Sequence, residues 1–99
     1  MSGVDFQGVA EVLTNAANAM EQDPSLDPDN AVRLAVWGVP DAVVPQRQTP
    51  ESDLYDEAVS AIECKTGWQG EGIAQVPRRE AIHAAREEAA RFGSYGGGR

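Results

Sequence analysis

The stretch Asp27-Pro28-Asp29-Asn30-Ala31-Val32-Arg33-Leu34-Ala35-Val36-Trp37-Gly38 decides the fold class of this chain. Asp27 is a preferred N-cap residue, and Pro28 suits the first helical position, where a backbone N–H has no helical partner. Gly38 is a common residue at helix ends. Residues 31–37 are apolar except for Arg33, so the pattern predicts a helix at the centre of the core. Val, Leu and Trp also suit a buried strand, but the proline start signal favours a helix.

The same start signal occurs a second time, at Thr49-Pro50-Glu51. Thr49 is expected as the N-cap and Pro50 as the first helical residue, with acidic residues in the first turn. The predicted helix covers residues 50–66 and ends at Gly67. Its expected apolar face comprises Leu54, Tyr55, Ala58, Val59, Ala61 and Ile62, and its polar face Asp53, Asp56, Glu57, Ser60 and Glu63.

Two further helices follow from apolar residues repeated at steps of three and four. The first is expected at residues 5–21, with Phe6, Val9, Val12, Leu13, Ala16, Ala17 and Met20 on one face. The second is expected at residues 77–92, opened by Pro77 and stopped by Gly93. The fold class is therefore all-α, a small bundle of about four helices with a loop-rich middle.

The segments between the helices are rich in proline and glycine. A short hairpin that pairs residues 42–44 with residues 73–76 is the main alternative to a purely helical fold. Ninety-nine residues suffice for one domain with a modest core. We expect a single helical domain over residues 1–93, followed by a mobile Gly-rich tail over residues 94–99.

Charge is sorted along the chain, whose net charge is −8. The first thirty residues hold six acidic residues and no basic one, and four arginines lie within residues 78–91. Such sorting favours a polar binding surface over a catalytic pocket. Acidity disfavours direct nucleic-acid binding, because phosphates repel it, and it suits a basic partner protein.

Three features favour a cytoplasmic protein. Cys64 is the single cysteine, which fits a reducing compartment. The N-terminal residues show neither the basic nor the apolar region of a signal peptide. The longest apolar stretch, residues 31–44, is interrupted by Arg33, Gly38, Pro40 and Asp41, so no membrane span is expected.

The residues that could carry chemistry are few. His83 has no identifiable catalytic partner and is expected to be a surface residue of its helix. Cys64 lies near a helix C-terminus, where the dipole disfavours a thiolate, so we expect a small half-buried residue. The acids at 51, 53, 56 and 57 lack the spacing of a calcium loop. The glycines from Gly67 to Gly72 lack the Lys-Ser/Thr ending of a phosphate loop. The chain is thus predicted to be no enzyme, with no cofactor and no metal.

The remaining candidates are surface residues that could meet a protein partner. Acidic residues of the third helix, a tryptophan after it and basic residues of the fourth helix make up this set. The interface candidates are Asp53, Asp56, Glu57, Trp68, Arg78, Arg79 and Arg86. Because glutamates alternate with these arginines, the fourth helix is expected to present a mixed face, which could meet the acidic half of the same chain or of a second copy.

The order of these patterns resembles a family of short uncharacterised proteins from actinobacteria and their phages. The resemblance is carried by Val12-Leu13 with Ala16-Ala17, by residues 31–35, by Tyr55 with Ala58, by Trp68 and by the Arg-rich residues 78–90. It covers about two thirds of the chain. Gln69-Gly70 stand where that family tends to have Asn-Asp. The resemblance implies an origin and no functional residues.

These observations lead to three functional hypotheses. The first is a small non-enzymatic interaction protein of phage or actinobacterial origin whose acidic faces bind a partner protein. The second is a virion or assembly component that forms a homo-oligomer through residues 78–91 against a neighbour's acidic half. The third is an acidic DNA mimic that blocks a nucleic-acid-binding protein.

Overall fold

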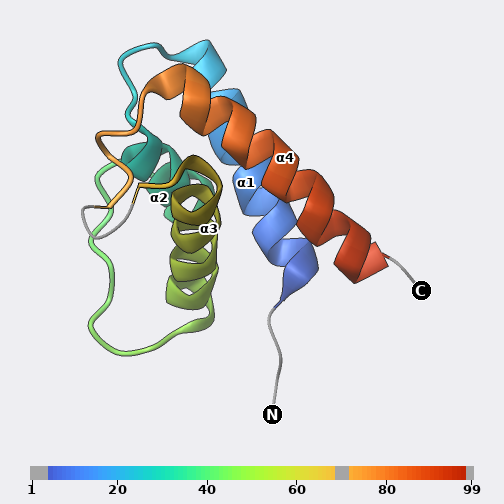
Figure 1. Ribbon diagram of the computed structural model, residues 1–99. Helices are drawn as coiled ribbons and strands as arrows, with labels where there is room; N and C mark the ends of the chain where they lie inside the picture. Colours follow the sequence, from blue (N-terminus) through green and yellow to red (C-terminus); the bar gives the residue numbers. More distant parts are fainter. Residues whose placement is uncertain (1–4, 69–71, 98–99) are drawn as a thin grey trace.

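The computed structural model describes residues 5–68 and 72–97. Within these ranges the chain forms four α-helices and no strand (Figure 1): α1 (Phe6–Gln22), α2 (Pro28–Trp37), α3 (Pro50–Thr66) and α4 (Arg78–Gly97). The all-α prediction is confirmed. The hairpin alternative is wrong, because residues 73–76 form a turn in which the Val76 N–H donates to the Ile73 carbonyl at 3.1 Å. The side chains of Ile73 and Val76 are buried in the core.

The caps of α2 and α3 are those that the sequence predicts. The Asp27 carboxylate accepts a hydrogen bond from the Asn30 N–H at 2.8 Å, and α2 ends at Gly38 with a φ of 85°. Thr49 and Ser52 form a reciprocal capping box at the start of α3, which ends at Gly67 with a φ of 83°. Because both glycines adopt left-handed backbone, they stop the helices where an L side chain would be strained.

The core is centred on the antiparallel pair of α1 and α4 (Figure 1). Small residues line much of the contact, which lets the two helix backbones approach closely. A Cβ atom added at Gly93 of α4 would lie 3.8 Å from the Cβ of Ala10 in α1. The fully buried large side chains are Val9, Leu13, Met20, Val32, Ile62 and Ile73.

The last helix is longer than the sequence predicts. It continues through Gly93 to Gly97 rather than ending at residue 92. Gly93 has room against Ala10, and Tyr95 lies in an aromatic cluster, 5.3 Å from the ring centroid of Phe6 and 6.1 Å from that of Phe92. These tertiary contacts outweigh the weak helix propensity of the glycines. Residues 98 and 99 of the predicted tail lie outside the described residues.

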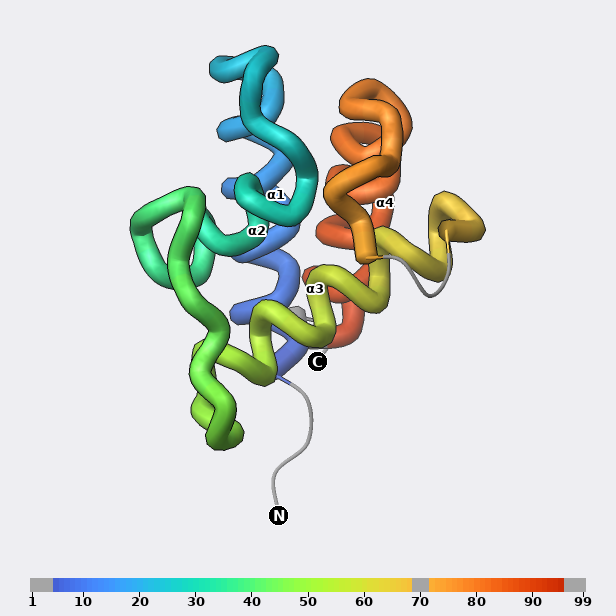
Figure 2. Tube along the Cα trace, turned by 90° about the vertical axis from the view of Figure 1, so that its left-hand side faces the viewer, coloured from blue at the N-terminus to red at the C-terminus, as the bar shows by residue number. Residues whose placement is uncertain are grey.

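The expectation that residues 31–37 form the central helix is wrong. Of α2, only Pro28, Ala31 and Val32 are buried, whereas α1 contributes seven buried residues and has the most extensive packing, chiefly against α4. Ten residues make α2 too short to span the core. Figure 2 shows α3 running across the α1–α4 pair. The acid-rich side of α3 is exposed at Asp53 and Asp56.

The helical body has a Cα radius of gyration of 12.4 Å, close to the ~13 Å of a compact 100-residue domain. None of the described helices combines the length and apolar character needed to cross a bilayer.

Candidate functional site

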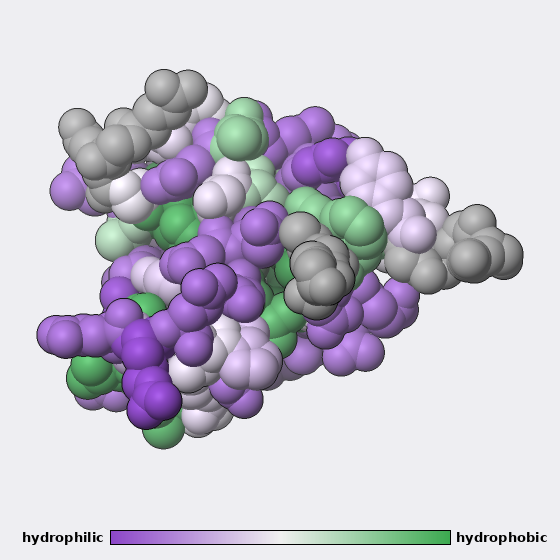
Figure 3. Space-filling model, turned by 90° about the horizontal axis from the view of Figure 1, so that it is seen from below, coloured by the Kyte–Doolittle hydropathy of each residue, from purple (hydrophilic) through white to green (hydrophobic). Residues whose placement is uncertain are grey.

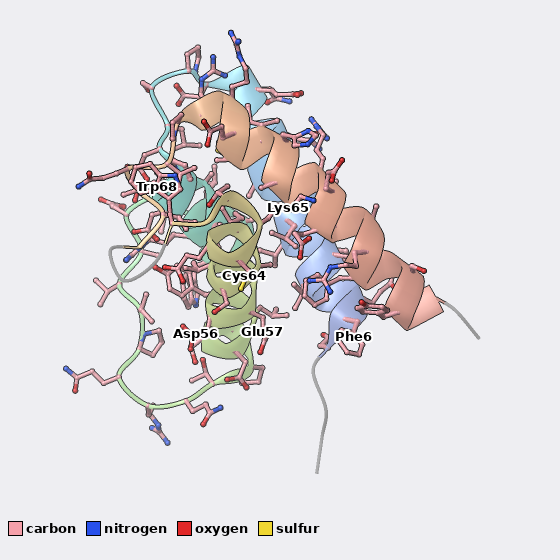
Figure 4. The ribbon with its side chains drawn as sticks, viewed as in Figure 1. Phe6, Asp56, Glu57, Cys64, Lys65 and Trp68 are labelled. Carbon is pink, nitrogen blue, oxygen red and sulfur yellow. The ribbon has the colours of Figure 1, made fainter. Side chains whose placement is uncertain are left out.

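The outward side of α3 carries a row of carboxylates, here called the α3 acidic face and defined as Asp53, Asp56, Glu57 and Glu63. Asp53 and Asp56 are exposed, and Glu57 and Glu63 are half-buried. Asp53 accepts a hydrogen bond from Gln48 Nε2 at 2.8 Å, and no ion pair within the described ranges involves any of the four. Figure 4 shows Asp56 and Glu57 on the same stretch of helix as Cys64. This face therefore presents negative charge that no ion pair of the described residues neutralises.

The arginines of α4 behave differently, because several are already engaged by the rest of the chain. Arg86 Nη2 lies 2.6 Å from Glu21 Oε1 and 3.1 Å from Asn18 Oδ1, which joins α4 to the end of α1. Arg78 Nη1 donates to the carbonyl of Met20 at 3.2 Å, at the negative end of the α1 dipole. Of the two alternatives for this basic segment, contact with the acidic half of the same chain is thus observed at one ion pair, Arg86 with Glu21.

Arg91, at the other end of α4, is also paired. It donates to Glu88, whose side chain is nearly buried, through Nε at 3.1 Å and also through Nη2. Its Nη1 donates to the Tyr95 hydroxyl at 3.0 Å, and its guanidinium lies 4.9 Å from the Phe92 ring centroid. These partners raise the pKa of Arg91, first through Glu88 and then through Tyr95. Glu88 is one of two buried polar or charged residues in the described ranges, and the arginine compensates its charge.

Arg79 is the candidate arginine whose side chain has neither an ion pair nor a hydrogen bond to its own chain within residues 5–68 and 72–97. It lines a shallow groove between the last turn of α3 and the first turns of α4. The structure therefore does not gather Arg78, Arg79 and Arg86 into one free basic patch. Their partners depend on how α1 and α4 pack, and sequence spacing alone does not give this.

Trp68 and Cys64 lie near the end of α3 with different exposures. Trp68 follows the Gly67 cap, is half-buried and packs against the core, so only part of this interface candidate is accessible to a partner. Cys64 is exposed on the outward side of α3 and not half-buried as expected. The reason is helical position, since Ser60 and Cys64 lie four residues apart on the side opposite buried Ala61 and Ile62.

A polar cluster that the sequence analysis missed joins α2 to α3. The Tyr55 hydroxyl donates to Asp29 Oδ1 at 2.6 Å and accepts from Arg33 Nη2 at 3.3 Å. Arg33 pairs with Asp29 at 3.2 Å, and its Nη1 donates to the Ala42 carbonyl at 2.6 Å. Burial first, and then the hydrogen bond to Asp29, raise the pKa of Tyr55 to about 12. The spacing of Asp29 and Arg33 signals their pairing, but no local pattern indicates Tyr55.

The Ala42 contact holds the connector between α2 and α3 against the helical body. This connector, residues 38–49, exposes Val39 and Val43, which keep 48% and 86% of their accessible surface. Seen from below in Figure 3, hydrophobic residues show as separate areas among hydrophilic ones. Val39 and Val43 therefore present small apolar areas on a mainly polar surface.

His83 lies on the exposed side of α4, with 70% of its side chain accessible, and its Nε2 is 3.5 Å from Glu87 Oε2. No group of three metal-ligating side chains is present in the part of the chain that the structure describes. Comparison of the chain with protein-family models, curated proteins and solved structures finds no match.

Proposed function

We propose that this chain is a small non-enzymatic interaction module whose α3 acidic face binds a basic segment of a protein partner. The observation that carries the proposal is the contrast between the two charged surfaces. Arg86 and Arg91 form ion pairs within the chain, whereas Asp56, Glu57 and Glu63 form none among the described residues.

The physical role of such a face is to attract and orient a partner more than to supply affinity. An exposed ion pair is worth only about 0.2–1 kcal/mol, so four carboxylates alone hold a basic segment weakly. Their summed field raises the association rate and rejects acidic partners. Binding is therefore expected to weaken as salt is added.

We place this module in the cytoplasm, where its single exposed thiol stays reduced. That thiol also supplies the test. A photo-crosslinker attached to Cys64 reports on the acidic face, and the same reagent attached to a Thr14→Cys, Cys64→Ser variant reports on an exposed site of α1. Both proteins are incubated with host lysate, and crosslinked partners are identified by mass spectrometry.

The expected result is a partner captured through Cys64 and not through position 14. Capture falls with added salt and is lost when Asp56 and Glu57 are both changed to Lys. A variant with the same charge change elsewhere, Glu11→Lys with Asp41→Lys, retains it. Capture that survives reversal of Asp56 and Glu57 refutes the acidic-face proposal.

Light scattering after size exclusion at low and high salt separates the alternatives. A stable oligomer of defined size at low salt, weakened by salt, replaces our proposal with the assembly hypothesis. The engaged states of Arg78 and Arg86 favour partner binding over that hypothesis. Displacement of the captured partner by DNA supports the DNA-mimic hypothesis instead.

A further inference from the structure

A second surface, on the other side of α3 from the acidic face, has the chemistry of a small-anion site. The groove between the end of α3 and the start of α4 has a volume of about 470 Å³, within the size range of small-ligand pockets. Its lining residues are Lys65, Thr66, Arg79, Glu80, His83 and Ala84. Figure 4 shows Lys65 on the side of α3 that is turned toward α4.

One carboxylate is already held by the basic groups of this groove. Lys65 Nζ lies 2.9 Å from Glu87 Oε1, and His83 Nε2 lies 3.5 Å from Glu87 Oε2. The hydrogen bond to Glu87 raises the pKa of Lys65, and the same bond lowers the pKa of Glu87. Glu87 is therefore a built-in example of the anion that these side chains accept.

Arg79 adds a cation whose charge no ion pair of the described residues neutralises. Its planar guanidinium presents paired N–H donors that match two oxygens of a phosphate group, and Lys65 can contribute a further charge-assisted bond. Glu80 also lines the groove and repels a bare anion. A ligand whose hydroxyl group donates to Glu80 turns that repulsion into a hydrogen bond.

We propose that this groove binds a small hydroxylated organic phosphate, with Arg79 and Lys65 on the phosphate and Glu80 on a hydroxyl. Glu87 acts as an internal competitor for Lys65 and His83. This site lies outside the proposed protein-binding face and does not depend on it.

The test is a titration of the ¹⁵N-labelled full chain with glycerol 3-phosphate, followed by backbone amide NMR shifts at constant ionic strength. Inorganic phosphate and acetate are titrated in parallel. Saturable shifts are expected at Lys65, Thr66, Arg79 and His83 with glycerol 3-phosphate, weaker ones with inorganic phosphate, and the weakest with acetate. Absence of saturation at these residues, or equal binding of acetate, overturns the proposal.

Variants give effects of opposite sign. Arg79→Gln is expected to weaken binding about ten-fold, since it removes a charge-assisted contact. Glu87→Gln is expected to tighten binding about three-fold or more, since it frees Lys65 from a competing carboxylate. The matched controls are Arg47→Gln and Glu11→Gln, exposed residues outside the groove whose substitution makes the same charge changes. Control effects as large as the groove effects indicate general electrostatics and overturn the site.

Discussion

Replacing Tyr55 by Phe tests the cluster that joins α2 to α3. The substitution keeps the ring, which lies 5.6 Å from the Trp37 ring centroid, and removes the hydroxyl that donates to Asp29 and accepts from Arg33. Asp29 and Arg33 keep their own ion pair at 3.2 Å. The measured loss is therefore that of the hydroxyl group alone.

The hydrogen bonds of the hydroxyl give the magnitude. A hydrogen bond to a charged group contributes about 1.5–3 kcal/mol. The Asp29 and Arg33 side chains each keep 24% of their surface, so water and salt reduce this figure. We expect Tyr55→Phe to lower the free energy of unfolding by about 1–2 kcal/mol at neutral pH.

The pH dependence has a definite sign. Because the folded pKa of Tyr55 lies above the unfolded one, its stabilisation is fully present below pH 10.0 and is lost as the pH rises through about 12. The difference between the wild type and Tyr55→Phe is thus expected to close over this range.

Urea unfolding followed by tryptophan fluorescence measures this difference, with Tyr95→Phe as the control for losing an exposed tyrosine hydroxyl whose hydrogen bond, from Arg91, lies at the surface. At neutral pH the midpoint of Tyr55→Phe should fall by about 1 M. Tyrosinate absorbance of the Tyr95→Phe protein, in which Tyr55 is the remaining tyrosine, should show a midpoint near 12. An unchanged urea midpoint, or a titration midpoint near 10.0, refutes the reasoning.

Three substitutions at helix positions give further expectations, each measured by urea unfolding. Gly93→Ala places its Cβ at an ordinary 3.8 Å from that of Ala10 and should raise the free energy of unfolding by about 0.5–1 kcal/mol; a loss would contradict the described α1–α4 contact. Gly8→Ala pushes its Cβ into the Asp5 carboxylate that caps α1, so we expect the free energy of unfolding to fall by up to about 1 kcal/mol. A rise equal to that of Gly93→Ala would contradict the described contact between Gly8 and Asp5. Thr49→Ala removes half of the α3 capping box and should cost about 1 kcal/mol; an unchanged midpoint would show that the Ser52 half suffices.

The helix boundaries that could be predicted from the sequence are those set by interactions between residues close together in the chain. Asp27 with Pro28 and Thr49 with Pro50 mark starts through backbone hydrogen bonding, and Gly38 and Gly67 mark ends through left-handed backbone. Such signals act within a few residues, so they can be read without knowing the fold. The helix does not end at Gly93, because the effect of this glycine depends on its contact with Ala10, which is far away in the sequence.

The candidate site likewise has features that helical periodicity predicts and features that depend on how the helices pack. The exposed side of α3 follows from helical periodicity, so the positions of Asp53 and Asp56 were predictable. Whether an arginine of α4 is free or engaged depends on the antiparallel contact with α1, which brings Arg86 to Glu21 and Arg78 to Met20. The sequence pattern predicts Tyr55 on the apolar face of its helix. The partners of its hydroxyl lie on α2, and the sequence of α3 does not indicate which residues of α2 it will meet.

The contact between Phe6 and Tyr95 means that the first turn of α1 and the last turn of α4 meet at one end of the bundle (Figure 1). A short flexible linker can therefore join these two points without stretching the chain. The connector of residues 38–49 is attached by the Arg33 bond to Ala42 and lies outside the helices. Opening the chain there yields a circular permutant that retains every helix and the whole α1–α4 contact, now within a single continuous helical hairpin.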